Sequence, residues 1–317
     1  MSNPTLGLVL EGSREPVGPD RMAARAMAVD LTAGVVPGVS VLARRYDALI
    51  IDLWGVLHDG VRPYPWVIPC LEKLRAAGKR TCALSNAPRR VDRIAAYLAE
   101  IGLPPELLGA IYSSGEATYE ALRENRGDPP LGGGRCFFIG AAADAALASV
   151  DGVRLVRNPA EADFVLCTGI EAVDDRLENY QGILRACLRH ALPLICANPD
   201  LEVMHGDRIK MCAGTLAAFY EGEGGRVVYY GKPFRQVYER CLEILAAPRE
   251  RVLAVGDSFL TDVSGADVAG LDCLFIAAGI EAGDMLAPDG SVDGAALARR
   301  AAAWKRRPRW TAPRFAW

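Results

Sequence analysis

Residues 48–56 read ALIIDLWGV, and this stretch decides how the chain folds. Its first four residues form an uninterrupted apolar run, which predicts a buried strand. Asp52 follows that run directly, and Gly55 permits a sharp turn at the strand's end. A carboxylate among apolar neighbours costs free energy unless it is paired or bound to a metal. Asp52 is therefore the first candidate functional residue, with an N-cap at the strand end as the plainer alternative.

Apolar runs of the same kind recur along the chain. The segment around Cys70 predicts a helix closed by Gly78, residues 81–84 predict the next strand, and 89–101 predict a second helix. This alternation is typical of a doubly wound α/β fold with a parallel sheet. Further strands are predicted, too many for one small sheet, at 136–139, 164–167, 194–197, 227–230, 252–255 and 273–276.

Two joints rich in glycine, at 127–134 and 221–225, interrupt this alternation. Such joints are typical of the hinges of an inserted domain. We therefore predict a core made of residues 31–125 and 228–317, with an inserted α/β cap domain over residues 126–227. The first part of the chain, residues 1–30, is interrupted by glycine and proline and is predicted to be a leader of low order.

Composition limits the classes of partner. The 317 residues carry a formal net charge of -3, which gives no general field to attract nucleic acid or an anionic membrane surface. No apolar run is long enough to cross a membrane, and the N-terminal segment has no signal-peptide pattern. Nine cysteines without a CxxC pair suit a reducing cytosol. We expect a cytoplasmic protein that binds neither nucleic acid nor membrane. The basic C-terminus contains Trp304, Trp310 and Trp317, which favour packing or self-association at least as much as an anionic partner.

Polar residues directly after the predicted strands are the candidates for chemistry, because ligands of parallel α/β sheets bind at the carboxyl ends of strands. They supply a carboxylate nucleophile, a hydroxyl donor, a cation and two more carboxylates, which is the set that phosphoryl transfer through an aspartyl phosphate needs. In chain order these residues are Asp52, Ser85, Asn86, Lys232, Asp257 and Asp262.

Four segments, each after a predicted strand and in a fixed order, resemble the motifs of the haloacid dehalogenase superfamily. The resemblance extends from about Arg45 to Gly279 and is to the class IIA branch of sugar-phosphate, nucleotide and 4-nitrophenyl phosphatases. Four motifs in the correct order are a specific signal, whereas any one alone would be weak. The segments are DLWGVLHDG (52–60), LSNAPRR (84–90), YGKPF (230–234) and GDSFLTDVSGADVAG (256–270).

The resemblance implies a Mg²⁺-dependent hydrolase of a small phosphorylated metabolite, with Asp52 as both nucleophile and metal ligand. Asp257 would ligate Mg²⁺, Asp262 would support the metal directly or through water, and Trp54 would offer its backbone carbonyl. The plainer interpretation of Asp262 is a cap of the following helix. Class IIA relatives often pair through their caps, so the resemblance also implies a possible homodimer.

The resemblance also implies contacts to the substrate. Ser85 would donate a hydrogen bond to the phosphoryl group with Asn86 beside it, although both are also common helix caps. Lys232 would pair with the nucleophile and the phosphate, unless it is a plain surface lysine. Asn198 and Asp200 follow a predicted strand of the insert and either touch the substrate or form a turn.

Trp54 departs from the family pattern. Superfamily phosphatases carry a second aspartate two residues after the nucleophile, and it protonates the leaving oxygen and then activates water. Indole is neither acid nor base at physiological pH. Three alternatives follow. The protein is a phosphatase that is slow or limited to good leaving groups, with His58 or a water in place of the aspartate. Otherwise it catalyses another reaction on this scaffold, such as C–P cleavage, or it binds Mg²⁺ and phosphate without catalysis. His58 is equally a plain loop residue beside the turn-forming Asp59.

Overall fold

The computed structural model describes residues 34–125, 134–172, 174–205, 208–279 and 285–317. The predicted leader, residues 1–30, lies outside them. From Leu31 onward the chain forms one compact unit. No helix in the described ranges is long and apolar enough to cross a membrane.

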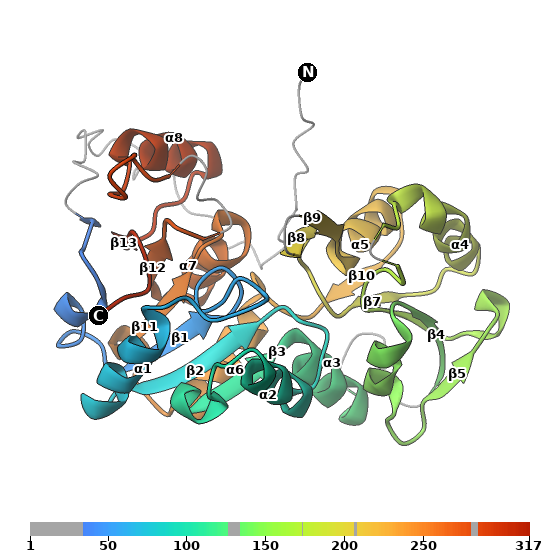
Figure 1. The fold of residues 1–317 in the computed structure, drawn as a ribbon. Helices are drawn as coiled ribbons and strands as arrows, with labels where there is room; N and C mark the ends of the chain where they lie inside the picture. The colour runs from blue at the N-terminus through green and yellow to red at the C-terminus, as the bar shows by residue number, and fades with distance from the viewer. Residues whose placement is uncertain (1–33, 126–133, 173, 206–207, 280–284) are drawn as a thin grey trace, which may run out of the picture. The chain divides into compact units, whose positions relative to one another are not determined.

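A six-stranded sheet is built around the strand that holds Asp52 (Figure 1). All of its pairings are parallel, and Ile51 lies opposite Val255 on one side and Ala83 on the other. The strand order is β13-β12-β11-β1-β2-β3. The bounds are β1 Ala48–Asp52, β2 Arg80–Ser85, β3 Ala110–Ser113, β11 Val252–Gly256, β12 Asp272–Ile276 and β13 Trp310–Ala312.

Helices cover both faces of this sheet because the side chains of a buried strand alternate between its faces. Leu49 and Ile51 of β1 pack in one cluster with apolar residues of α1 (Val67–Ala76) and α2 (Val91–Glu100). Ile50 points the other way, into a cluster formed with α6, α7 and α8. Those helices span Arg235–Leu245, Ser264–Ala269 and Gly294–Trp304. The predicted doubly wound α/β fold is confirmed.

A second, five-stranded parallel sheet lies between β3 and α6 in sequence, in the order β10-β7-β6-β4-β5. We call residues 134–230 the inserted segment. Its strands are β4 Arg135–Ile139, β5 Arg154–Val156, β6 Phe164–Cys167, β7 Leu194–Cys196 and β10 Val227–Tyr229, and its helices are α4 Leu177–Arg189 and α5 Ala213–Gly222. An antiparallel hairpin, β8 Glu202–His205 with β9 Arg208–Met211, follows β7. The predicted boundary between residues 227 and 228 falls inside β10.

The remaining elements are short or connect the two sheets. Helix α3 (Ser114–Arg123) leads from β3 toward the inserted segment, and its Leu122 packs in an apolar cluster with residues of that segment. The hydroxyl of Ser114 donates to the carbonyl oxygens of Ala197 and Tyr230, so it links the start of α3 to the ends of β7 and β10. Short 3₁₀ turns lie at Val39–Val41, Pro105–Leu108, Ala142–Ala148, Pro159–Glu161 and Arg249–Arg251.

Candidate active site

Asp52 is the last residue of β1, where the strand leaves the buried centre of the sheet. Its side chain is buried, and the Lys232 ammonium lies 2.6 Å from its Oδ1. The backbone N–H of Leu53 donates to the same oxygen at 2.8 Å. The cost of burying this carboxylate is therefore offset by one cation and one backbone donor.

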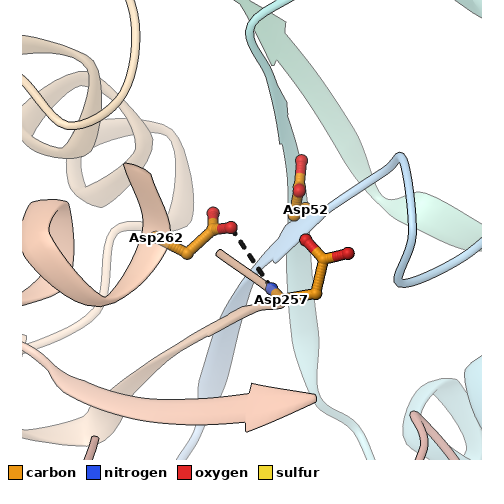
Figure 2. A group of neighbouring side chains, drawn as sticks. All are labelled: Asp52, Asp257 and Asp262. Carbon is orange, nitrogen blue, oxygen red and sulfur yellow. Dashed lines mark hydrogen bonds between the residues drawn. The ribbon is translucent and has the colours of Figure 1, made fainter. Parts of the chain in front are cut away.

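Asp257 and Asp262 follow β11, the strand next to β1. A π-helical turn, Phe259–Val263, brings the Asp262 carboxylate back toward the start of the loop, where its Oδ2 accepts from the backbone N–H groups of Asp257 and Ser258, each at 3.2 Å. Figure 2 shows the Asp52 and Asp257 carboxyl groups beside each other, with Asp262 turned toward the backbone nitrogen of Asp257. The loop thus holds two carboxylates in fixed positions next to the candidate nucleophile.

Glycines leave the room that these carboxylates occupy. A Cβ on Gly256 would lie 2.0 Å from the carboxyl carbon of Asp262, and one on Gly279 would lie 2.0 Å from Oδ2 of Asp257. Real Cβ atoms do not approach other atoms so closely, so any larger residue at these positions would displace a carboxylate.

The three carboxylates are arranged as a site that could hold a divalent metal. Asp52, Asp257 and Asp262 each offer one oxygen, and these oxygens lie within 4.8 Å of one another. Among the described residues, three acidic groups here share the single ammonium of Lys232, which contacts two of them. Hard divalent cations such as Mg²⁺ prefer oxygen ligands, and a buried excess of negative charge favours a bound cation. The donor set therefore fits Mg²⁺.

Lys232 lies between two carboxylates and is almost completely buried. Its Nζ is 2.9 Å from Oδ1 of Asp262 and 2.6 Å from Asp52. Burial by itself disfavours the charged ammonium, but the carboxylates of Asp262 and Asp52 outweigh that effect and raise the pKa of Lys232. The lysine remains a cation, able to neutralise charge at the nucleophile.

Burial has the opposite consequence for Asp52, since it disfavours the carboxylate. Loss of solvation raises the pKa of Asp52 to about 7, although the Lys232 charge opposes this shift. The nearby Asp262 carboxylate adds to the rise because like charges repel. A bound divalent cation would favour the ionised carboxylate that a nucleophile requires.

Asn86 fixes the position of Lys232 through its backbone. Its Oδ1 accepts from the Lys232 N–H at 2.7 Å, and its Nδ2 donates to the Lys232 carbonyl at 3.1 Å and to Asp200 Oδ1 at 2.8 Å. Ser85, the last residue of β2, accepts from the backbone N–H of Ala87 at 3.1 Å. Asn198 accepts from the backbone N–H of Asp200 at 3.1 Å, which is the turn that the sequence allowed. All of these side chains reach one site.

A cavity of about 530 Å³ is lined by these side chains except Asp262, which contacts Lys232 and is not part of the lining. Both sheets contribute strand ends to its lining: Asp52, Ser85 and Asp257 from the six-stranded sheet, and Asn198 and Lys232 from the ends of β7 and β10. The structure therefore brings together every candidate residue that the sequence predicted, since Trp54, His58 and Asp200 line the same cavity, and Asn86 and Asp262 contact Lys232.

Trp54 and His58 lie on the loop after β1, and they contact each other. Their rings meet edge to face with centroids 5.2 Å apart, and His58 also meets Tyr97 at 5.9 Å. His58 is buried, and loss of solvation lowers its pKa to about 4. Its Nδ1 accepts from the backbone N–H of Gly60 at 3.0 Å. At neutral pH His58 is therefore an uncharged hydrogen-bond acceptor within an aromatic cluster.

Sequence reasoning missed two parts of the cavity wall. Tyr97 comes from α2, and its position in the helix resembles that of any half-buried aromatic residue. Arg300 and Trp304 come from α8, four residues apart and thus on one helical face, but the sequence analysis did not place them at the site. Of the alternatives left open for the basic C-terminus, Trp310 shows packing, because Trp310–Ala312 forms an edge strand and Trp310 donates to the Tyr46 hydroxyl at 2.8 Å. The i, i+4 spacing was the available signal.

A parallel sheet with a lysine-paired aspartate and a carboxylate cluster at its carboxyl edge is the arrangement that the resemblance to the haloacid dehalogenase superfamily implied. Residues 49–154 match the family model described as haloacid dehalogenase-like hydrolase, and residues 229–299 match a second model, of HAD-hydrolase-like proteins. The crystal structure of a haloacid dehalogenase-like family hydrolase from Brucella suis 1330 is 33% identical, with a TM-score of 0.76 over 89% of this chain and 100% of that one.

Two further relatives agree with this placement. Chronophin of Mus musculus is 27% identical over 68% of this chain and 76% of its own length. A glycerol phosphate phosphatase from Mycobacterium tuberculosis, solved in complex with magnesium, shares the fold with a TM-score of 0.60 at 24% identity, over 75% of this chain and 70% of its own. The chain belongs to the haloacid dehalogenase-like hydrolase family, in its class IIA, phosphatase-like branch, as the sequence motifs predicted.

Proposed function

We propose that this protein hydrolyses the phosphate ester of a small metabolite through an aspartyl phosphate on Asp52, with Mg²⁺ as cofactor. The observation that carries the proposal is the position of Asp52, which faces the cavity between Lys232 and the Asp257 carboxylate. Phosphatases of this family use Mg²⁺, and relatives such as the D-glycerol 3-phosphate phosphatase of Mycobacterium tuberculosis act on small phosphate esters.

Each residue has a distinct task in this reaction. The Asp52 carboxylate attacks phosphorus, forming an O–P bond as the ester P–O bond breaks, and water later cleaves the aspartyl phosphate to release phosphate. Lys232 neutralises charge on the nucleophile and the phosphoryl oxygens. Ser85 and Asn86 hold the phosphoryl group and the Lys232 backbone. Mg²⁺, held by Asp52, Asp257 and the Trp54 carbonyl with support from Asp262, would supply charge for the phosphoryl oxygens.

His58 is a poor substitute for the missing aspartate. A group with a pKa near 4 carries almost no proton to donate at neutral pH, and it is also a weak base. Its Nδ1 is engaged with Gly60. We infer that, among the described residues, the loop after β1 offers no dedicated proton donor, so turnover favours substrates with good leaving groups.

The inserted segment supplies Asn198, Asp200 and the hairpin residues on the other side of the cavity. We propose that it acts as a cap domain that excludes water and selects the substrate. The homodimer through this segment stays a prediction.

The test of the proposed function is turnover of 4-nitrophenyl phosphate with and without Mg²⁺. We expect Mg²⁺-dependent activity in the wild-type protein and a loss of at least about a thousandfold in Asp52→Asn, because the amide cannot form the phosphoryl bond. Asp47→Asn is a matched control, since Asp47 is paired with Arg251 outside the cavity. Undiminished activity in Asp52→Asn would exclude the proposed nucleophile.

A further inference from the structure

Trp54 occupies the position at which the family carries its proton donor, and the backbone of Gly60 packs against its indole ring. A Cβ on Gly60 would lie only 2.4 Å from Cζ2 of Trp54, so the Gly60 backbone lies directly against the six-membered ring. Gly60 has φ +91°, a conformation that favours glycine. No side chain larger than hydrogen fits between the loop and the indole.

Gly60 is itself held from two sides. Its N–H donates to Nδ1 of His58 at 3.0 Å, and its carbonyl accepts from the Tyr97 hydroxyl at 2.7 Å. His58 also packs edge to face against the Trp54 ring. The loop from Trp54 to Gly60 therefore holds the indole ring of Trp54 at the cavity wall. His58 is a positioning residue, because it contacts both the Trp54 ring and Gly60.

Other aromatic and aliphatic side chains line the same cavity as Trp54. Tyr97 and Ile94 from α2, Leu260 from the turn after β11, and Trp304 from α8 line the same cavity. Aromatic side chains give large contact areas and bind the faces and edges of other rings. The cavity thus combines a charged end at Asp52 with an aromatic and aliphatic wall.

Because an indole cannot donate a proton to the leaving oxygen, Trp54 also restricts which leaving groups can depart, whatever the shape of the cavity. Without a proton donor at this position, the ester P–O bond must break with both electrons leaving on oxygen, and the departing group is an oxyanion that takes its proton from water later. Such departure becomes faster as the oxyanion becomes more stable, and delocalisation of the charge is the main way in which the leaving group of an ester is stabilised. Phenols, hydroxylated heteroaromatic rings and enols form these stabilised oxyanions, and all of them are planar and conjugated.

We propose that Trp54 is the specificity-determining residue, and that it binds the planar, conjugated leaving group of an aryl or enol phosphate by ring contact. This proposal rests on the proposed phosphatase function and names its substrate class. The loss of the proton donor and the gain of a ring surface at one position then have a single explanation, because both select the same kind of leaving group.

The first experiment measures selectivity in turnover. We expect wild-type kcat/KM to fall steeply as the leaving-group pKa rises along a series of substituted phenyl phosphates, and to be at least about a hundredfold lower for glycerol 3-phosphate, the size of a missing acid's contribution. Trp54→Asp should flatten that dependence. Equal wild-type turnover of 4-nitrophenyl phosphate and glycerol 3-phosphate would overturn the proposal.

The second experiment measures binding without turnover, by calorimetry in the presence of Mg²⁺. Phenylphosphonate and methylphosphonate carry the same charged head and differ only in the ring. We expect the wild-type protein to prefer the phenyl compound by about tenfold, and Trp54→Leu to lose that preference while Trp54→Phe keeps part of it. Trp317→Leu is the control, because Trp317 is partly exposed and is not part of the cavity lining.

The two experiments separate failure of the substrate class from failure of the reaction. If Asp52→Asn retained full turnover, the nucleophile would be wrong, yet the phosphonate preference would still report on Trp54. If neither phosphonate bound, the proposed phosphoryl site itself would be wrong. If both bound equally, or if Trp317→Leu lost the preference as fully as Trp54→Leu, Trp54 would not be the selecting surface.

Discussion

His58 is a buried base whose environment keeps it uncharged. It packs between Trp54 and Tyr97 and accepts a hydrogen bond from Gly60, so the folded chain has no group at Nδ1 to stabilise an added proton. In the unfolded chain the same imidazole is solvated and takes up a proton near its ordinary pKa of about 6.5. This difference couples the protonation of His58 to folding.

We predict that His58 destabilises the fold in acid. Its folded-state pKa of about 4 lies below the unfolded value, so the free energy of unfolding is unaffected above pH 6.5 and decreases as the pH falls toward 4. The full difference is about 3 kcal/mol at 1.36 kcal/mol per pH unit. Urea unfolding of wild type and His58→Asn between pH 7 and 4 measures it, because asparagine keeps an acceptor for Gly60 and removes the titration. Parallel stability curves for the two proteins would show that His58 has the same pKa in the folded and the unfolded chain.

At the scale of residues, the sequence predicts positions better than contacts. The positions after predicted strands singled out Asn86 and Lys232, and the resemblance implied that Asn86 lies beside the phosphoryl group. The structure also bonds Asn86 to Asp200 and to the Lys232 backbone. Those partners lie 114 and 146 residues away along the chain. Gly60 and Tyr97 carry no local signal for their contact with each other. Such long-range pairs depend on the packed fold and are not readable from spacing.

The two sheets meet at the end of β10. Gly231 follows β10 with φ +134°, and a Cβ there would lie 2.6 Å from Oδ1 of Asn86 and 2.7 Å from Cδ of Pro199. Strand β2, which precedes Asn86, and strand β7, which precedes Pro199, thus end against the residue before Lys232. The contacts around Gly231 leave no space for a side chain at that position.

We predict that Gly231→Ala destabilises the chain by more than backbone strain alone. Alanine at positive φ costs about 1 kcal/mol or more, and contact with Asn86 and Pro199 adds to it. Gly224→Ala is the matched control, since Gly224 also has positive φ (+91°) but nothing lies within 4 Å of its Cβ position. Thermal unfolding of both variants measures the difference. Equal shifts in Tm would mean that the contacts around Gly231 relax without cost.

Elements were predictable where apolar runs were long. The four-residue runs around Ile51, Leu84 and Val255 each became a buried strand of the six-stranded sheet. Strands β3, β5 and β13 were missed because these short strands carry polar or exposed side chains, whereas the equally short β7 and β10 are continuous apolar or aromatic runs. The hairpin of β8 and β9 alternates charged and apolar residues too briefly to stand out from a loop. Pairing with a neighbour, rather than local propensity, makes these strands.

Across the whole molecule, the described part of the chain concentrates acidic groups at one buried point. Asp52, Asp257 and Asp262 lie together with one ammonium between two of them, and Asp200 is close enough to raise the pKa of Lys232 as well. Like charges at this distance repel in a medium less polar than water. A bound divalent cation would relieve the repulsion, so metal binding and stability of the fold should be linked.

We predict that Mg²⁺ raises the Tm of the wild-type chain, because a ligand that binds only the folded state stabilises it by about 2.7 kcal/mol at a hundred times its Kd. Asp257→Asn should lose this response, since it removes one ligand of the cluster and leaves the side chain's shape. In metal-free buffer the same variant should be as stable as wild type or more stable, because it removes one of the repelling charges. Asp47→Asn, outside the cluster, should keep the full Mg²⁺ response. Differential scanning calorimetry with EDTA and with a Mg²⁺ series gives both comparisons, and a Mg²⁺ response retained by Asp257→Asn would place the metal elsewhere.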